Sequence, residues 1–583
     1  GRGSGDGFSE VPSNLSGMGN CNHPFSFAGY EEHSASIPEK EEEDRIVRLE
    51  QAKSRSSNAV STHARYHYKG SRTLQQDYVV DEMVLGTGLC GQVLLARSRA
   101  DNRRYALKSI QKKQVPAHKL RALTAEVEIY LTLDHPNIAR LRDVYETNTE
   151  ICLLLECCEG GEMYERLHKL GVYKDADAAE ATRQMLCAVG HLHSRDIVHR
   201  DIKLENFLYE SNAENAELRL IDFGFAKVWD PSTLMLASCG SVAYVSPDVI
   251  CGKGYTSQCD MWSLGVVLWM ILTGYPPFHG SERAMMDCIK AGKPDWSHKR
   301  RWQPVAPEAI DLVKRLLEKD PARRLTAQQA LCHTWLVDRK QRTQVQLSRS
   351  ALRSLSAFSK ATRVRRAVLL LLAQELGPDE TRELREAFLS IDQSNKGTIC
   401  LRDLKDAIRN SNALSPVKRK AKKDCSEAES PDAPMSCSPK SPSTREGEDV
   451  SPARALRRAN SHTLSELFRI LDANGDERIY YSDFLAATIE VRSKLQDEAV
   501  RATFRRLDAD DSGTISVSDF RTVLGDSFDT SEVKNFLAQV DARGRGEIGY
   551  EEFVQEFKRS EGSAVSEGSL LKHHAPAAAI GGC

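Results

Sequence analysis

Four short strings occur in a fixed order within one globular stretch, and together they restrict the fold more than composition does. They are the glycine-rich string Leu85–Val93, the triplet Ala106-Leu107-Lys108, the octet His199–Asn206 and the triplet Asp222-Phe223-Gly224. Glycines at GxGxxG spacing let backbone amides approach phosphates that a side chain would block. Since a dinucleotide-binding turn shares this spacing, the first string alone is weak evidence, but chance does not explain all four in this order.

The composition along the chain predicts several units, because 583 residues exceed what one ordinary core holds. Residues 1–77 are polar and lack apolar periodicity, which predicts a disordered N-terminal extension. Apolar alternation and a buried-helix pattern at Val266–Leu272 indicate a globular domain over 78–336. The remaining predicted segments are a basic amphipathic junction helix at 337–376, a region of Asp-rich turns at 377–560 with a disordered insertion at 411–457, and a C-terminal tail at 561–583.

Charge and cysteine usage limit the partners and the location. Lys plus Arg (80) nearly balances Asp plus Glu (82), so we expect no nucleic-acid partner and no general attraction to a membrane. The 15 cysteines contain no CxxC pair, which is typical of reduced thiols and predicts a cytoplasmic protein. Membrane association is expected only through lipidation, which the pattern disfavours because Gly5 stands where the myristoylation motif has Ser or Thr.

At these strings the sequence resembles the eukaryotic protein kinase family, over about 260 residues. The resemblance implies a bilobal α+β domain that binds ATP and Mg²⁺. It assigns three catalytic residues: Asp201 would orient or accept the proton of the substrate hydroxyl, Lys203 would neutralise charge on the phosphoryl group, and Asn206 would hold Mg²⁺ together with Asp222.

The same resemblance assigns the nucleotide site. Lys108 would reach the α- and β-phosphates and would be held by Glu126 from a following helical stretch. The backbone of Glu156 and Cys158 would bond to adenine, with Leu155 guarding the rear of the pocket. The other residues predicted at this site are Leu85, Gly86, Gly88, Gly91, Val93, Ala106, Glu162 and Leu208.

Two glutamates predict the substrate preference. Glu162 and Glu205 match positions that in basophilic kinases pair with an Arg three residues before the acceptor, so we expect protein substrates of the form Arg-x-x-Ser/Thr. Lys203 beside Glu205 favours Ser or Thr over Tyr as acceptor. Met270 stands where cyclic-nucleotide-dependent relatives have a second acidic residue, which selects an Arg two residues before the acceptor. We therefore expect no such additional preference. The alternative is that both glutamates are ordinary solvated surface residues.

The sequence also departs from the kinase pattern. Cys90 replaces the usual aromatic residue at the tip of the glycine loop, and Ser246-Pro247-Asp248 replaces Ala-Pro-Glu, for which we expect Asp248 still to pair with Arg324. Arg200 before Asp201 suggests phosphorylation of the activation segment. The candidate acceptors are Ser232, Thr233, Ser238 and Ser241.

Four Asp-rich turns, at 392–403, 472–483, 508–519 and 541–552, are candidate EF-hand loops. Such a loop places oxygen ligands at positions 1, 3, 5, 7, 9 and 12, Gly at 6 and an apolar residue at 8. The third loop meets the pattern best. Its predicted ligands are Asp508, Asp510, Ser512, Thr514 and Asp519, and those of the second loop are Asp472, Asn474, Asp476 and Asp483.

The other loops carry defects. Glu477 replaces the position-6 Gly of the second loop, Lys396 occupies position 5 of the first, and Arg543 and Arg545 displace two ligands of the fourth. The pattern therefore favours ion binding in the third loop, leaves the second undecided and disfavours the first and fourth.

Kinase motifs, a basic junction and four EF-hands together resemble the calcium-dependent protein kinases of plants and protists, over residues 78–558. The resemblance implies a bilobal kinase followed by an all-α, calmodulin-like region, and a serine/threonine protein kinase that uses ATP, Mg²⁺ and Ca²⁺. In that family the junction holds the kinase off until calcium makes the EF-hands grip it. From its residues alone, the junction is equally a calmodulin-type target, a membrane-surface helix or a packing helix.

Two alternatives stay open at this point. The chain could be an active kinase whose EF-hands are structural and insensitive to calcium. It could instead be a pseudokinase scaffold, against which the presence of Lys108, Asp201, Asn206 and Asp222 weighs strongly.

Overall fold

The computed structural model describes most of the kinase-like and EF-hand regions. The described residues are 66–68, 72–88, 91–114, 126–228, 235, 242–252, 254–337, 347–410, 461–472, 474–489, 497–524 and 528–558. The predicted insertion 411–457, the tail 561–583 and the candidate phosphorylation sites in the activation segment lie outside them. None of the helices in these ranges is both long and apolar enough to cross a membrane.

The N-terminal lobe is a six-stranded sheet with the order β1-β5-β6-β4-β3-β2. Its strands are β1 (Tyr66–Tyr68), β2 (Tyr78–Gly88), β3 (Gly91–Ser98), β4 (Arg104–Gln111), β5 (Leu141–Glu146) and β6 (Glu150–Glu156). In the register of this sheet Lys108 of β4 lies between Val93 of β3 and Leu153 of β6. Pairing from both sides fixes the height at which the Lys108 side chain leaves the sheet.

The predicted disordered extension, residues 1–77, carries two short elements near its end. Strand β1 pairs in parallel with β5, and helix α3 (Leu74–Asp77) precedes β2. The His67 ring stacks on Tyr145 at 4.7 Å, and Leu74 is buried. Strand β1 is stabilised by residues far along the chain. The local sequence therefore showed no hydrophobic periodicity that would predict it. Residues 1–65 lie outside the described part.

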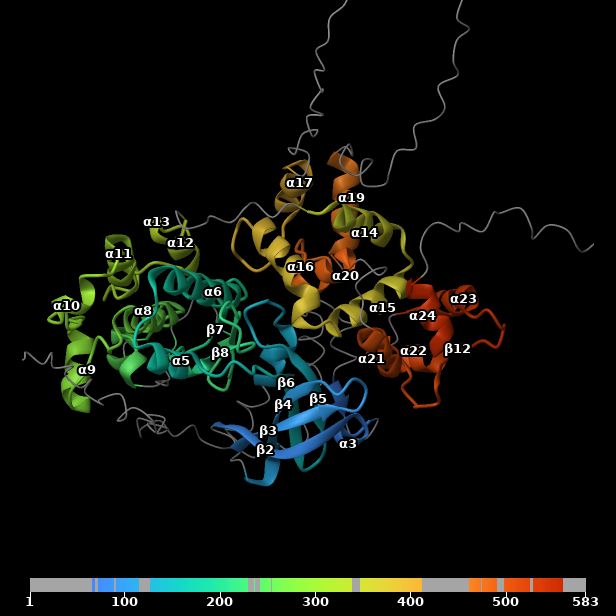
Figure 1. The fold of residues 1–583 in the computed structure, drawn as a ribbon, viewed down its shortest axis with the longest axis horizontal. Helices are drawn as coiled ribbons and strands as arrows, with labels where there is room; N and C mark the ends of the chain where they lie inside the picture. The colour runs from blue at the N-terminus through green and yellow to red at the C-terminus, as the bar shows by residue number, and fades with distance from the viewer. Residues whose placement is uncertain are drawn as a thin grey trace, which may run out of the picture.

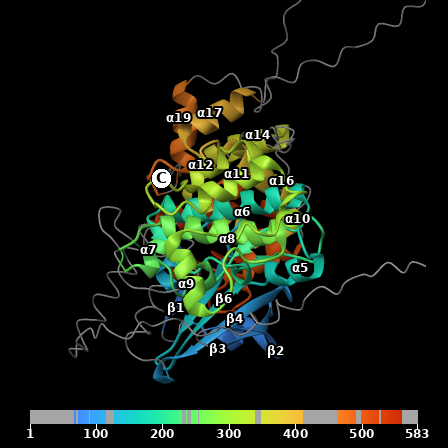
Figure 2. The ribbon, with the colours of Figure 1, turned by 90° about the vertical axis from the view of Figure 1, so that its left-hand side faces the viewer.

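The C-terminal lobe is helical and lies beside the sheet (Figures 1 and 2). Its helices are α5 (Met163–Leu170), α6 (Asp175–His193), α7 (Pro247–Ile250), α8 (Gln258–Thr273), α9 (Glu282–Ala291), α10 (Lys299–Trp302), α11 (Pro307–Leu316), α12 (Ala327–Leu331) and α13 (Thr334–Val337), and its short elements are β7 (Ile197–Val198), η2 (Leu204–Asn206), β8 (Phe207–Tyr209), β9 (Leu218–Leu220), β10 (Lys227–Val228) and η3 (Val242–Tyr244). Helix α8 is buried from Cys259 to Thr273, which confirms the buried helix predicted around Val266–Leu272.

A buried ion pair joins α7 to the loop between α11 and α12. The guanidinium of Arg324 donates to Asp248 Oδ1 at 3.0 Å, and to the carbonyls of Gln258 at 2.6 Å and Glu318 at 2.9 Å. The expected pairing of Asp248 with Arg324 is thereby confirmed. The shorter aspartate stem suffices because Arg324 is anchored by carbonyl oxygens as well.

The junction forms two helices, so the expectation of a single helix over 337–376 is wrong. They are α14 (Arg349–Lys360) and α15 (Arg363–Gln374). The chain is extended at Ala361 and Thr362, and the Thr362 side chain accepts a hydrogen bond from the Arg365 amide, which starts a new helix. A threonine N-cap inside a long amphipathic pattern was the signal for this break.

The EF-hand region is all-α and forms one hydrophobic core with the junction. Its elements are α16 (Pro378–Ile391), α17 (Leu401–Asn410), α19 (Ser461–Leu471), α20 (Tyr481–Thr488), α21 (Asp497–Leu507), β11 (Thr514–Ile515), α22 (Val517–Leu524), α23 (Thr530–Val540), β12 (Ile548–Gly549) and α24 (Tyr550–Lys558). The first loop pairs with the second through Ile399 and Ile479, and the third pairs with the fourth through β11 and β12. Helix α15 contacts both halves, through α20 and α21 (Figure 1).

Candidate active site and ion-binding loops

Lys108 is held in place by two acidic residues. Its Nζ lies 2.7 Å from Glu126 Oε1, in the helical stretch 126–132, and 3.5 Å from Asp222 Oδ1. Burial alone would lower the pKa of Lys108, but Glu126 and Asp222 outweigh it and raise the pKa above its ordinary value. For Asp222, burial is likewise outweighed, first by Lys108, so its pKa is lowered. The lysine therefore stays charged and the Asp222 carboxylate stays ionised.

Asp222 adopts a strained backbone that its neighbours maintain. Its φ is +59°, which costs a residue with a Cβ about 1–2 kcal/mol. The Asp222 amide donates to the Tyr130 hydroxyl at 3.1 Å, and the buried Phe223 ring packs between Tyr130 (4.6 Å) and His199 (5.1 Å). These contacts turn the carboxylate toward Lys108.

The predicted catalytic residues converge in the loop before β8. Lys203 Nζ lies 2.8 Å from Asp201 Oδ2, and Asn206 Nδ2 donates to the Asp201 carbonyl at 2.7 Å and to Oδ2 at 3.2 Å. Because its amide nitrogen is used in this way, Asn206 has its amide oxygen for a metal ion. With the Asp222 carboxylate this is an all-oxygen donor set, which suits Mg²⁺.

Sequence reasoning missed Asp260, which fixes this loop from below. It is buried and accepts hydrogen bonds from the amides of His199 (2.9 Å) and Arg200 (2.8 Å) and lies 2.9 Å from His193 Nε2. Burial would raise the pKa of Asp260, but His193 and the other donors lower it. One charge at the start of the otherwise uncharged helix α8 was the available signal.

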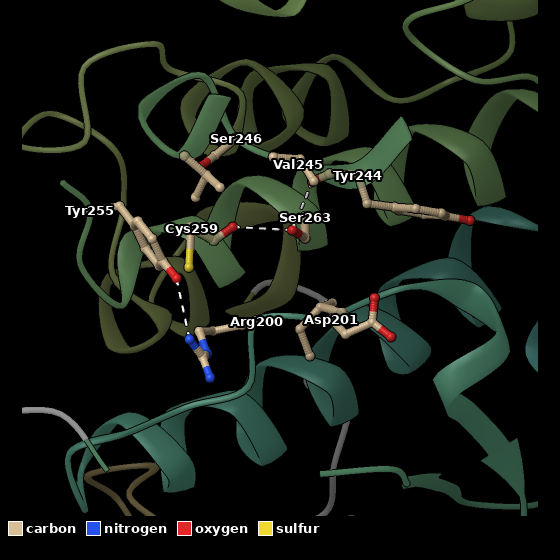
Figure 3. A pocket seen from close by; sticks show the side chains of 10 residues that line it. Arg200, Asp201, Tyr244, Val245, Ser246, Tyr255, Cys259 and Ser263 are labelled. Carbon is tan, nitrogen blue, oxygen red and sulfur yellow. Dashed lines mark hydrogen bonds between the residues drawn. The ribbon is translucent and has the colours of Figure 1, made fainter. Parts of the chain in front are cut away.

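The catalytic loop is packed against the segment that leads into α7 (Figure 3). Ser263 of α8 donates to the Tyr244 carbonyl at 2.8 Å, and Arg200 lies 3.4 Å from the Tyr255 hydroxyl. The cavity between these groups is only about 10 Å³, about enough for one water. Asp201 and Tyr244 are therefore held in a fixed relation to each other.

The predicted adenine contacts line the junction of the two lobes. Val93 and Ala106 lie on β3 and β4, and Leu155 and Glu156 end β6. The Glu156 amide already donates to the Arg140 carbonyl at 2.9 Å, so this amide is used within the protein. The other predicted residues lie close by: Leu85, Gly86 and Gly88 are in the last part of β2, Gly91 begins β3, Cys158 follows β6, and Leu208 of β8 lies opposite Glu162.

Glu162 and Glu205, the glutamates predicted to select the substrate, are both half-buried. Burial is the first cause that raises the pKa of both groups. The charge of Glu205 is the next cause for Glu162. Two carboxylates that repel each other in a partly buried place are stabilised by an incoming cation.

All four candidate loops have EF-hand backbone geometry. Positive φ angles occur at positions 4 and 6 of each loop, at Asn395 and Gly397, Gly475 and Glu477, Asp511 and Gly513, and Gly544 and Gly546. Glu477 therefore adopts the left-handed conformation, at +63°, that its position requires. As anticipated for a residue with a Cβ, this is a strained turn, by about 1–2 kcal/mol.

The third loop fits a divalent cation. Carboxylate oxygens of Asp508, Asp510 and Asp519 lie within 4.8 Å of one another. Burial, which exceeds the opposing hydrogen bonds, raises the pKa of Asp508. Ser512 and Thr514 stand in the same turn, where Ser512 Oγ is 3.3 Å from Asp508 Oδ1. Hard oxygen ligands that converge around a common point are what Ca²⁺ and Mg²⁺ bind.

The fourth loop does not fit an ion. The guanidinium of Arg545 lies 2.9 Å from Glu552 Oε2, and Arg543 lies 3.9 Å from Oε1. Position 12 should supply a bidentate carboxylate to the cation, and here it binds arginine instead. The guanidinium of Arg545 therefore occupies the carboxylate that would bind the ion.

The first two loops are intermediate. In the second, Asp472 accepts amide hydrogen bonds, but the Tyr480 hydroxyl donates to Asp476 at 2.5 Å, and burial, then Asp134, raises the pKa of Asp483 well above its ordinary value. In the first, burial raises the pKa of Asp392 to about 6. A side chain in place of Gly397 would overlap the rings of His135 and His191, so this loop fits closely against the two-lobed domain.

The EF-hand region docks on the two-lobed domain through its first two loops. Ser482, at the start of α20, donates through N and Oγ to Asp134 at 2.8 and 2.6 Å. The carbonyl of Lys396 meets His191 Nδ1 at 3.1 Å. Asp134 thus caps a helix of the second EF-hand, a role that its place in the sequence did not reveal.

A second docking contact is a buried ion-pair network on β5. Arg142 binds both carboxylate oxygens of Glu375 at 2.6 Å, and Arg506 of α21 lies 2.9 Å from Asp143 and 3.6 Å from Glu375. Burial would raise the pKa of Asp143, but Arg506, His67 and Arg142 outweigh it and lower the pKa. The network joins β5, the end of the junction and the third EF-hand.

Comparison with known proteins gives two domain matches and a set of relatives. Residues 79–336 match the protein kinase domain and residues 462–525 match the EF-hand domain pair. The chain is 30% identical to calcium-dependent protein kinase 34 of Arabidopsis thaliana, over 81% of the chain and 82% of that protein. It is 30% identical to calcium-dependent protein kinase 12 of the same plant, over 85% and 92%, and 31% identical to calcium-dependent protein kinase 9 of Oryza sativa subsp. japonica, over 81% and 76%.

The fourth loop generates a test by gain of function. Replacing both arginines, Arg543→Asp with Arg545→Asp, releases Glu552 and supplies acidic ligands at positions 3 and 5. We expect one additional Ca²⁺ bound per chain at saturation, measured by equilibrium dialysis of the full chain.

The matched control is Arg402→Asp with Arg409→Asp, which makes the same charge change on the exposed face of α17. It should leave the stoichiometry unchanged. An unaltered stoichiometry in the Arg543/Arg545 variant would contradict the assignment of the arginines as the block.

Proposed function

The chain belongs to the calcium-dependent protein kinase family, and from this premise we propose that it phosphorylates Ser or Thr three residues after an Arg, under control of an ion in loop 508–519. Membership makes it a calcium-regulated serine/threonine protein kinase that uses ATP, Mg²⁺ and Ca²⁺. The observation that carries the proposal is the joint presence of an assembled Lys108–Glu126 pair and one convergent ion loop. The cytoplasmic location stays a prediction.

In the proposed mechanism the chain positions the reactants and balances their charge. Asp201 accepts a hydrogen bond from the substrate hydroxyl and takes its proton as the phosphoryl group moves. Lys203, 2.8 Å from Asp201, lies ready to neutralise charge on that group. Lys108 orients the α- and β-phosphates. Mg²⁺ held by Asn206 and Asp222 would supply the remaining neutralisation of the phosphate oxygens.

The substrate preference is proposed from Glu162 and Glu205. Burial is the first cause that raises the pKa of both carboxyl groups, although Lys203 lowers it, so a further positive charge nearby would stabilise their ionised forms. An arginine of the substrate, placed three residues before the acceptor, would supply it through a bidentate hydrogen bond.

Calcium control is proposed to act through α21. Arg506 lies two residues before the first ligand, Asp508, and binds Asp143 of the kinase sheet. An ion that orders the third loop would also order the last turn of α21. We propose that the EF-hand region and the junction then bind the N-terminal lobe more tightly.

The second candidate is an active kinase with structural EF-hands. The specific observation in its favour is the Arg545–Glu552 pair, which closes the fourth loop without an ion. The two candidates differ in whether free Ca²⁺ changes the rate.

Phosphate transfer to an Arg-x-x-Ser peptide, measured against free Ca²⁺, separates them. We expect calcium to raise the rate and Asp508→Ala with Asp519→Ala to abolish the rise, because the ion loses two of its carboxylates. Asp201→Asn should lower the rate about 10²–10⁴-fold at every calcium level, since it removes the base.

The control for the loop variant is Glu498→Ala with Glu551→Ala, which removes two exposed carboxylates of α21 and α24 in the same half of the EF-hand region. Its calcium response should match the unmodified chain. A calcium-independent rate that still requires Asp201 would favour the second candidate and reject calcium control.

The pair of glutamates generates a test of specificity. In Glu162→Gln with Glu205→Gln, KM for an Arg-x-x-Ser peptide should rise about 10–100-fold, as expected for a lost charge-assisted pair of about 1.5–3 kcal/mol. KM for the Ala-x-x-Ser peptide should not change.

The same pair predicts a pH dependence. Because their pKa values are raised, these carboxylates lose charge at a higher pH than ordinary glutamates as the solution is acidified. KM for the arginine peptide should therefore rise on acidification in the unmodified chain and stay flat in the double variant. Equal pH profiles for the two proteins would contradict the role of the pair.

A further inference from the structure

Two histidines and an aspartate converge beside α9, in a part of the C-terminal lobe that neither the phosphate-transfer site nor the EF-hand loops use. His279 lies in the loop before α9, and Asp295 and His298 lie in the loop after it. His279 Nε2 is 2.8 Å and His298 Nε2 is 3.9 Å from the same oxygen, Asp295 Oδ2. One ligand atom of each residue lies within 4.8 Å of the other two.

We propose that His279, Asp295 and His298 form a Zn²⁺-binding site. Two imidazole nitrogens and a carboxylate oxygen are a common donor set for this ion, and three protein ligands leave a fourth position for water. With bonds of about 2.0–2.2 Å, ligand atoms around tetrahedral zinc lie about 3.4 Å apart. The observed separations of 2.8 and 3.9 Å bracket that value.

The backbone around the aspartate is fixed, so little ordering is needed for binding. The Asp295 amide donates to the Pro277 carbonyl at 2.9 Å, which ties together the loops on either side of α9. Its second carboxylate oxygen, Oδ1, accepts from the Ser297 amide at 2.9 Å. A hydrogen bond to the other oxygen of a ligating carboxylate is typical of metal sites, because it sets the orientation of the ligand.

The second histidine is also positioned. The ring of His298 packs edge-on against Tyr275 at 4.6 Å, and the Tyr275 hydroxyl is 3.4 Å from the Asp295 carbonyl. Both histidine side chains are 53% exposed, so an ion can enter from solvent and the rings can make small adjustments.

The simpler explanation is a hydrogen-bonded pair of His279 and Asp295 without an ion. It accounts for the short contact and for the lowered pKa of Asp295, about 2, whose first cause is His279. It does not account for His298, whose nitrogen faces the same oxygen at 3.9 Å, beyond hydrogen-bond distance. A cation between the three atoms would use both nitrogens and the shared oxygen as ligands.

The site would link the two loops that flank α9. That helix contacts α7 and η3, the segment that is packed against the catalytic loop. An ion at the site would therefore restrain an element next to the region where protein substrates approach. This inference does not depend on the substrate preference or on calcium control.

The test is Zn²⁺ binding to the full chain with the EF-hand loops saturated with Ca²⁺. Zn²⁺ affinity is measured by competition with a chromogenic chelator, and Co²⁺ absorption reports the coordination. Variant His279→Gln keeps a hydrogen-bond donor for Asp295 but removes the imidazole, and His298→Ala removes a ring that makes no hydrogen bond to Asp295 at 3.9 Å. The control is His168→Gln, an exposed histidine of α5.

We expect the unmodified chain and the His168→Gln control to bind one equivalent of Zn²⁺ that both site variants bind about tenfold or more weakly. The Co²⁺ complex should show the visible absorption of a four-coordinate site, lost in both variants. Retained phosphate transfer establishes that the variants fold. Equal Zn²⁺ affinity and stoichiometry in all four proteins would overturn the proposal, and loss in His279→Gln alone would reduce it to a two-residue site without His298.

Discussion

The position of the EF-hand region depends on four buried charges that meet on strand β5. Arg142 and Arg506 are balanced by Asp143 and Glu375, and the side chain of Glu375 is fully buried. Removing one member of such a buried network leaves an uncompensated charge, at a cost of about 3–5 kcal/mol. The network therefore fixes the position at which the end of the junction and the third EF-hand bind the sheet. This position lies at the β5 side of the sheet, away from the glycine-rich turn between β2 and β3.

This binding position connects the ion-binding loops with the catalytic residues through a few neighbouring elements of the fold. Strand β5 pairs with β6, and β6 pairs with β4, which carries Lys108. The other docking contact, in which Asp134 caps α20, follows directly on the helical stretch 126–132 that supplies Glu126. Strand β6 thus lies between β5 and the strand of Lys108, and the Asp134 contact adjoins the stretch that carries Glu126. In this docked arrangement the Lys108–Glu126 pair is formed.

The sequence predicted the catalytic residues and the EF-hand turns because their roles depend on short local strings. Asp201 and Asn206 meet within one loop, and positive φ at Gly513 follows from its place in a twelve-residue turn. It failed where structure depends on distant contacts. Strand β1 exists only because β5 receives it, and nothing near Asp134 shows that its carboxylate caps a helix about 350 residues later.

The most direct test of this account is the ratio of phosphate-transfer rates with and without Ca²⁺ in the variant Arg506→Gln. Arg506 touches no reacting group, but it joins the third EF-hand to Asp143. The account predicts that this ratio falls about tenfold or more, and that the double variant Asp143→Asn with Arg506→Gln partly recovers it, because no unpaired charge is left buried. An undiminished calcium response in Arg506→Gln would contradict the claim that this network carries the calcium signal to the kinase.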